Sequence, residues 1–282
     1  MSLRVLEPGP LTLVQDQGRP GWADLGVGPS GAFDLQALRA ANHLVGNPED
    51  CAALEALGGG LALVATAPHV VAVAGAAGQV SVDGRPVGSG RVLSLRRGDV
   101  LRLGAPAVGM RWTVAVAGGF RPEPVLGSRS FDTMAALGPA PLSRGDELVV
   151  GRPHGPVSLE TVPAYIAAGE VGVGVVLGPR DDWFTAQAIS TLLSCPWRVD
   201  PVSDRIGVRL EGPSLDRART GELESEPVVR GSIQVTSSGR PVVLGPDHPV
   251  TGGYPVIGVV VDTDALAQAR PGDVVRFRRH RA

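Results

Sequence analysis

The sequence predicts a mostly β protein with few helices, and three observations support this class. Short segments rich in Val, Leu and Ile recur along the chain, and 39 glycines and 25 prolines are spread among its 282 residues. Apolar segments of about four to eight residues bounded by Gly and Pro are typical of strands. Gly-Asp pairs at 98–99, 145–146 and 272–273 each precede such a segment, which indicates a recurrent turn.

Most predicted strands are isolated apolar segments between turns. In chain order they cover 11–14, 70–74, 79–82, 92–95, 100–103, 112–117, 147–150, 171–177 and 274–277. A hairpin is also predicted, because Ile233 and Val235 alternate with polar neighbours and Gly239 provides a tight turn before the apolar run 242–244.

Three helices are predicted. The first begins at Ser30 as N-cap, places Leu35, Leu38 and Val45 on one face and stops at Gly46. The second covers about 181–193, and the third about 264–269. Since the stretch 152–162 combines prolines with low hydrophobicity, we expect an N-terminal unit over 1–155 and a C-terminal unit over 156–282.

Composition excludes several classes of function. The net charge of −2 and the pI of about 6.2 provide no electrostatic footprint for nucleic acid. No apolar run reaches the ~18 residues of a membrane span. Residues 1–5 lack the apolar core of a signal peptide, so we expect a cytoplasmic protein. Cys51 and Cys195 fit neither a metal-ligand spacing nor a disulfide scaffold, and are expected to be reduced thiols.

All 26 basic residues are arginines. The absence of lysine excludes a Schiff-base lysine, a P-loop lysine and a lysine carrying covalent biotin. If the protein uses biotin, another chain must carry it.

The segment after the hairpin contains the strongest candidate chemistry. His248 beside Asp247 could serve as a general base or orient a substrate, or the two could be a turn cap and a surface ring. Adjacent residues on a strand point to opposite faces, so we do not expect them to act as a dyad. Gly252-Gly253 would let the backbone approach a ligand closely.

Polar residues cluster near the N-terminus as well. Arg19 could bind a carboxylate or phosphate through its planar guanidinium, or pair with Asp16. Capping explains Ser30 without any function, whereas Asp34 remains a candidate site residue.

In the second half, Ser203, Asp204 and Arg205 follow a proline, and we favour Arg205 over the acids of 222–226 as a site residue. Those acids could hold a metal or form a solvated loop. A serine-hydrolase triad is rejected because no Gly-x-Ser-x-Gly elbow occurs. The glycines at 58–60 are interpreted as a turn between strands, since no nucleotide-binding fingerprint surrounds them.

Three stretches resemble the allophanate hydrolase subunit 2 family, also called the biotin-dependent carboxyltransferase family. They are 12–19 continuing into 26–34, then 199–213, and then 232–257, within a similarity that spans roughly 3–277. Free-standing members of the family include the C subunit of 5-oxoprolinase and the KipI antagonist.

The resemblance implies two cyclophilin-like β-barrel units. It also implies the C subunit of an ATP-dependent 5-oxoprolinase, a hydrolase that is active only as a complex and converts 5-oxoproline, ATP and water to glutamate, ADP and phosphate. The expected partners are a KipI-like (allophanate hydrolase subunit 1) chain and the LamB/YcsF-type chain of the same complex. ATP would be a substrate of the complex, with Mg²⁺ as a possible companion.

Two alternatives stay open. One is the carboxyltransferase component of a urea carboxylase or allophanate hydrolase type of system, and the other is a non-catalytic antagonist of a KipI-like kinase inhibitor. Under the resemblance, the expected catalytic residues are Asp247, His248, Arg19 and Arg205. The expected substrate-binding residues are Gln15, Asp16, Asp34, Ser203, Gln234, Thr251, Gly252, Gly253 and Tyr254, and no residue is assigned to a metal.

Overall fold

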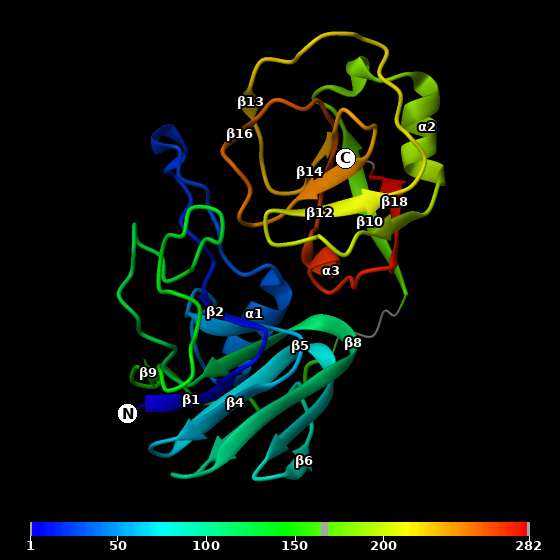
Figure 1. The fold of residues 1–282 in the computed structure, drawn as a ribbon. Helices are drawn as coiled ribbons and strands as arrows, with labels where there is room; N and C mark the ends of the chain where they lie inside the picture. The colour runs from blue at the N-terminus through cyan, green and yellow to red at the C-terminus, as the bar shows by residue number, and fades with distance from the viewer. Residues whose placement is uncertain (1, 165–168, 281–282) are drawn as a thin grey trace. The chain divides into compact units, whose positions relative to one another are not determined.

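The computed structural model describes residues 2–164 and 169–280, and the chain divides into two compact units (Figure 1). The first comprises Met1–Arg19, Ser30–Asp132 and Ala136–Ile166, and the second Pro20–Pro29, Thr133–Ala135 and Ala167–Ala282. Both are built mainly of β-strands. The predicted class, mostly β with two barrel-like units and a few short helices, is confirmed.

The first unit contains one curled sheet of nine strands. Its strands are β1 (Ser2–Pro8), β2 (Leu11–Gln15), β3 (Ala53–Leu57), β4 (Leu61–Ala65), β5 (His69–Val82), β6 (Arg85–Val87), β7 (Val92–Leu95), β8 (Val100–Val116) and β9 (Glu147–Val149). The main path runs β2-β3-β8-β4-β1-β9, and β5 pairs with β6, β7 and β8. The buried side chains of Leu54, Leu63 and Trp112 belong to its core.

Two long strands, β5 and β8, replace four predicted short ones. We predicted separate strands over 70–74 and 79–82, and over 100–103 and 112–117. This prediction is wrong, because the first two segments lie on the continuous strand β5 and the last two on β8. The register between β5 and β8 shifts around Gly75, Ala77 and Gly78. Such bulges bend a strand without ending it, so the glycines that suggested turns mark bends in a continuous ladder.

The first helix, α1 (Leu35–Leu44), packs against β5 and β8. Its N-cap is Asp34, whose Oδ1 accepts a hydrogen bond from Ala37 N at 2.8 Å. The predicted start at Ser30 is wrong, since Ser30 has a φ of 52° and lies outside the helix. The capping function that was expected of Ser30 therefore belongs to Asp34.

The second unit is organised around a closed barrel with the strand order β10-β17-β14-β15-β12-β11-β18. Its strands are β10 (Glu170–Leu177), β11 (Trp197–Val199), β12 (Gly207–Glu211), β14 (Ser232–Val235), β15 (Pro241–Leu244), β17 (Val256–Val260) and β18 (Val274–Arg279). A separate two-stranded ribbon pairs β13 (Glu226–Pro227) with β16 (Thr251–Gly252). Trp197, Ile233 and Phe277 on the barrel strands are among the fully buried side chains of the second unit.

The helical segments of this unit are short. They are η1 (Ala23–Leu25), η2 (Asp181–Trp183), α2 (Ala186–Ser194) and α3 (Asp264–Ala267). The predicted helix over 181–193 is two elements, because Thr185 is extended and its side chain caps α2 by accepting from Ala188 N. Within the described ranges, no helix has the length and apolar character to cross a membrane.

The predicted hairpin is confirmed: β14 and β15 pair antiparallel, with Ile233 opposite Val243. Gly239 has a φ of 77° in the connecting turn, a conformation that favours glycine. The hairpin brings the polar segment after Leu244 to one end of the barrel strands.

The recurrent Gly-Asp turn is confirmed at all three places. In each, the Asp carboxylate accepts from the backbone N–H three residues earlier, at 2.7 Å for Asp99, 2.7 Å for Asp146 and 2.8 Å for Asp273. The preceding glycines have φ values of 95°, 97° and 88°. The turns start β8, β9 and β18, so this local device is used in both units.

Candidate functional site

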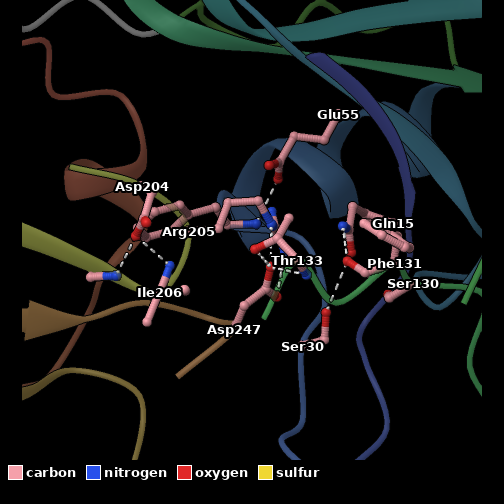
Figure 2. A network of polar contacts seen from close by, with 12 residues as sticks. Gln15, Ser30, Glu55, Ser130, Phe131, Thr133, Asp204, Arg205, Ile206 and Asp247 are labelled. Carbon is pink, nitrogen blue, oxygen red and sulfur yellow. Dashed lines mark hydrogen bonds and ion pairs between the residues drawn. The ribbon is translucent and has the colours of Figure 1, made fainter. Parts of the chain in front are cut away.

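A fully buried carboxylate, Asp247, lies at the centre of the polar network of the second unit (Figure 2). Arg205 binds it in bidentate fashion, with Nε 2.8 Å from Oδ2 and Nη2 3.0 Å from Oδ1. Thr133 donates twice to Oδ2, from its backbone N at 3.0 Å and from Oγ1 at 2.8 Å. The segment Thr133–Ala135, which is remote in sequence, therefore completes this network.

The charge of Asp247 is stabilised in spite of its burial. Burial by itself would raise the pKa of this carboxyl, but the Arg205 charge and the hydrogen bonds from Arg205 and Thr133 lower it below its ordinary value of 3.8. A carboxylate held ionised by several donors is a poor proton acceptor at neutral pH. The geometry shows that Asp247 and Arg205 hold each other in place, and the catalytic role expected of Asp247 stays a prediction.

Local turns explain why the pair forms. The carboxylate of Asp204 accepts from Ile206 N at 2.8 Å and from Gly207 N at 3.0 Å, which fixes the turn that carries Arg205. The backbone N of Asp247 donates to Arg205 O at 3.1 Å, so the two turns are also joined through their main chains. Ser203, expected to bind substrate, hydrogen-bonds through Oγ with the backbone N and O of Arg209.

His248 follows Asp247 in the same turn, and only 4% of its surface is exposed. The expectation that these two residues lie on a strand is wrong, since β15 ends at Leu244. Nδ1 lies 2.7 Å from Pro249 O, and because a carbonyl oxygen only accepts, Nδ1 carries the hydrogen of this bond. In the neutral ring the lone pair is consequently on Nε2, the atom that could accept a proton.

The Thr251–Tyr254 segment combines one buried contact with exposed groups. Gln234 on β14 donates from Nε2 to Tyr254 O at 3.3 Å. A Cβ at Gly252 would lie 2.2 Å from Gln234 Nε2, so this glycine makes room for a protein side chain. Thr251, Gly253 and Tyr254 are exposed, which leaves them accessible to a ligand or a partner chain.

The first unit has its own buried carboxylate, Asp16, at the end of β2. Its Oδ1 accepts from Gly18 N at 2.8 Å and from the hydroxyls of Ser128 and Ser130 at 2.6 Å each. Its Oδ2 accepts from Arg129 N at 2.6 Å. These donors are all uncharged groups, and the side chain of Arg19 is not among them.

Asp16 accepts hydrogen bonds from the loop 128–131, and residues near Asp16 donate hydrogen bonds to carbonyl groups of this loop. Arg19, which is 2% exposed, donates from Nη2 to Ser130 O and from Nε to Val125 O at 3.3 Å. Gln15 donates from Nε2 to Phe131 O at 2.8 Å, and Ser30 donates to the same carbonyl at 3.2 Å (Figure 2). The expected catalytic and binding residues of the N-terminal cluster thus meet at one loop of their own unit, and Asp34 caps α1.

A further buried pair, Glu55 and Arg111, was missed at the sequence level. Glu55 Oε1 lies 3.6 Å from Arg111 Nε, and Oε2 accepts from Phe33 N at 2.6 Å. The guanidinium of Arg111 lies 4.6 Å from the centre of the Phe33 ring. The signal that could have identified Glu55 is a lone carboxylate inside the apolar strand β3 (Ala53–Leu57).

The acids near 222–226 do not assemble a metal site in the part of the chain that the structure describes. Glu226 is paired with Arg180 through Nε at 2.9 Å. Among residues 2–164 and 169–280, no group of three or more His, Cys, Asp and Glu side chains could hold a metal ion.

Comparison with known proteins identifies the family to which this chain belongs. The chain combines a curled sheet in one unit with a closed barrel in the other, and its helices are few and short. The family model "Carboxyltransferase domain, subdomain A and B" matches residues 25–279, and the chain belongs to this family.

Two kinds of relative are similar over nearly the whole chain. The C subunit of 5-oxoprolinase from Escherichia coli (strain K12) is 34% identical over 280 residues, which cover 98% of this chain and 90% of that protein. "Urea amidolyase" of Lachancea kluyveri is 31% identical, covering 98% of this chain but 17% of its own length. The crystal structure of the K. lactis urea amidolyase superimposes with a TM-score of 0.92 at 30% identity, over 99% of this chain and 19% of that one.

Proposed function

We propose that this chain is the C subunit of an ATP-dependent 5-oxoprolinase, which opens 5-oxoproline to glutamate while ATP is converted to ADP and phosphate. The observation that carries the proposal is the 34% identity to the C subunit of a 5-oxoprolinase over 98% of this chain and 90% of the relative. Its partners would be a KipI-like chain and a LamB/YcsF-type chain, and we propose a cytoplasmic location.

The chemistry has a physical logic. A lactam carbonyl resists water, so phosphorylation of its oxygen by ATP would make its carbon more electrophilic. Water would then add to this carbon and the ring C–N bond would break, with the nitrogen leaving as an amine. Hydrolysis of the resulting acyl phosphate by a second water would release phosphate and glutamate. The site must then stabilise negative charge and exclude bulk water until hydrolysis is complete. ATP is a substrate of the complex in this proposal, Mg²⁺ would accompany the nucleotide, and this chain carries no covalent biotin.

Within this chain, His248 is the best candidate for moving a proton. Its Nδ1 hydrogen is donated to Pro249 O, which orients the ring and fixes its tautomer. The Asp247–Arg205–Thr133 network holds the turn that presents it. Exposed Thr251, Gly253 and Tyr254 on the neighbouring segment would contact substrate or a partner chain.

The test is phosphate release from ATP by the three reconstituted chains of the complex, with and without 5-oxoproline, and with this chain present or omitted. We expect 5-oxoproline to stimulate release only when this chain is present. Folded and associated partners that show no stimulation would contradict the proposal.

Substitution of His248 sharpens the test. His248→Gln should lower the stimulated rate by about 10²-fold or more, the usual contribution of a general acid or base, while co-purification with the partners is retained. His43→Gln is the control, because His43 is an exposed side chain of the first unit. Unchanged turnover in His248→Gln would remove His248 from the site.

A second candidate function is carboxyl transfer from carboxybiotin on another chain to an amide nitrogen. The similarity to urea amidolyase, in sequence and in structure, specifically favours it. Carboxylation of urea that depends on this chain and is blocked by avidin, with no stimulation of phosphate release by 5-oxoproline, would select this candidate. If neither activity depends on the chain while it still binds the KipI-like protein, the non-catalytic antagonist is selected.

A further inference from the structure

A small polar pocket of about 250 Å³ lies in the first unit, apart from every residue assigned to the proposed function. Its lining includes Cys51 before β3, Arg121 after the Gly118-Gly119 turn, Arg129 and His154. All of these residues belong to the same compact unit, so the pocket is complete within it.

The two arginines of the pocket are held in place but are not neutralised. Arg121 Nε donates to Gly118 O at 3.1 Å, and Arg129 Nε donates to Pro122 O at 3.0 Å. Both acceptors are uncharged carbonyls, and no carboxylate of the described chain forms an ion pair with either guanidinium. Asp50 also lines the pocket and is the opposing charge there, so two cations face one anion.

His154 holds the guanidinium of Arg121 and is present in a defined tautomer. Arg121 Nη2 lies 3.0 Å from His154 Nε2, and a guanidinium can only donate, so Nε2 is the acceptor. The ring hydrogen then lies on Nδ1, which is 3.4 Å from Asn47 Oδ1 and 4.0 Å from Cys51 Sγ.

A buried network of side-chain amides holds the segments that line the pocket. Asn47 Oδ1 accepts from Gly118 N at 2.8 Å, and its Nδ2 donates to Val116 O at 2.8 Å and to Asn42 Oδ1 at 3.0 Å. Asn42 in turn donates to Cys51 O at 2.7 Å. The loop that carries Arg121 and the segment that carries Cys51 are therefore tied to the same two asparagines, which preorganises the pocket.

We infer that this pocket binds a small oxyanion of the phosphate type. Planar guanidinium groups recognise phosphate oxygens through paired N–H donors, and the remaining N–H hydrogens of Arg121 and Arg129 are directed to no acceptor in the described residues. The ligand is either free phosphate or the phosphoryl end of a nucleotide. The site does not depend on the proposed function, since it contains none of the residues assigned there.

Binding is tested by titrating inorganic phosphate into the full-length protein by calorimetry, against chloride at equal ionic strength. Arg121→Gln and Arg129→Gln should each weaken phosphate binding by about tenfold or more, because a hydrogen bond to a charged group is lost. Arg97→Gln is the matched control, as Arg97 is an exposed arginine of the same unit outside the pocket. If circular dichroism shows that Arg121→Gln is misfolded, Arg129→Gln decides, because its side chain makes one contact fewer.

The cysteines provide a second readout that does not rely on affinity. Phosphate should slow the alkylation of Cys51 by iodoacetamide severalfold, as followed by mass spectrometry, and leave Cys195 of the second unit unchanged. Stronger protection by ADP than by phosphate would identify a nucleotide phosphoryl group as the ligand, and protection by phosphate alone a free anion. Equal protection by chloride, or phosphate binding that survives both pocket substitutions, would overturn the inference.

Discussion

Each unit has a buried aspartate at the centre of a polar network, Asp16 in the first and Asp247 in the second, and the donors around the two differ. Asp16 in the first unit is bound by two serine hydroxyls and by the backbone N–H groups of Gly18 and Arg129. Asp247 in the second unit is bound by the guanidinium of Arg205 and by Thr133. Neutral donors stabilise a carboxylate without adding a second buried charge, whereas a guanidinium makes each partner depend on the other.

The largest expected effect follows from that dependence. Asp247→Asn would leave the Arg205 charge buried without a counter-charge from this carboxylate, and we expect it to lower the free energy of unfolding by about 3–5 kcal/mol. Urea unfolding of the full-length protein measures this, with Asp24→Asn, an exposed position in the same unit, as control. A loss below about 1 kcal/mol would contradict the dependence of the Arg205 charge on Asp247.

Asp16→Asn should cost less, about 1–3 kcal/mol, because the hydroxyl and backbone N–H groups that donate to Asp16 are uncharged. The asparagine oxygen can keep the donors that now meet Oδ1, while its NH₂ group would oppose the Arg129 N–H that now meets Oδ2. The same unfolding assay applies. A loss as large as that of Asp247→Asn would refute the distinction between the two networks.

The Gly-Asp turn is the feature that the units share, so it should respond equally in both. Gly145→Ala in the first unit and Gly272→Ala in the second should each cost about 1–2 kcal/mol, since the positive φ opposes a side chain. A Cβ at either glycine would meet nothing within 4 Å. The loss of stability on substitution would therefore come from backbone strain and not from a steric clash. Arg144→Ala in the same turn as Gly145 is the control. Thermal unfolding measures all three variants, and unequal losses of stability for the two glycine variants would contradict the equivalence of the two turns.

The smallest effect near neutrality is the acid response of Asp247. Its pKa is lowered in the folded state, so the unfolded chain takes up this proton first as the pH falls, and the stabilisation is lost below the ordinary value of 3.8. Above about pH 5 the contribution is fully present. Stability measured between pH 6 and 3, at roughly half-unit steps, should fall less steeply for Asp247→Asn than for the natural protein, and parallel slopes would contradict the assignment.

The sequence by itself determined the features that depend on neighbouring residues. The β class, the 232–244 hairpin and the three Gly-Asp turns follow from local periodicity and turn chemistry. Many of the expected site residues are also buried together. Gln15, Asp16 and Arg19 meet the loop from 128 to 131, and Arg205 meets Asp247.

Only the tertiary structure decided which groups become partners. Thr133 and Asp247 are 114 positions apart, and no local sequence pattern predicts their contact. The same holds for Glu55 with Arg111, for Asp16 with its serines rather than with Arg19, and for the pocket formed by Cys51, Arg121 and His154. The continuity of β5 and β8 through their glycines was likewise decided by the partner strand, because ladder hydrogen bonds between remote segments outweigh the local preference of glycine for turns.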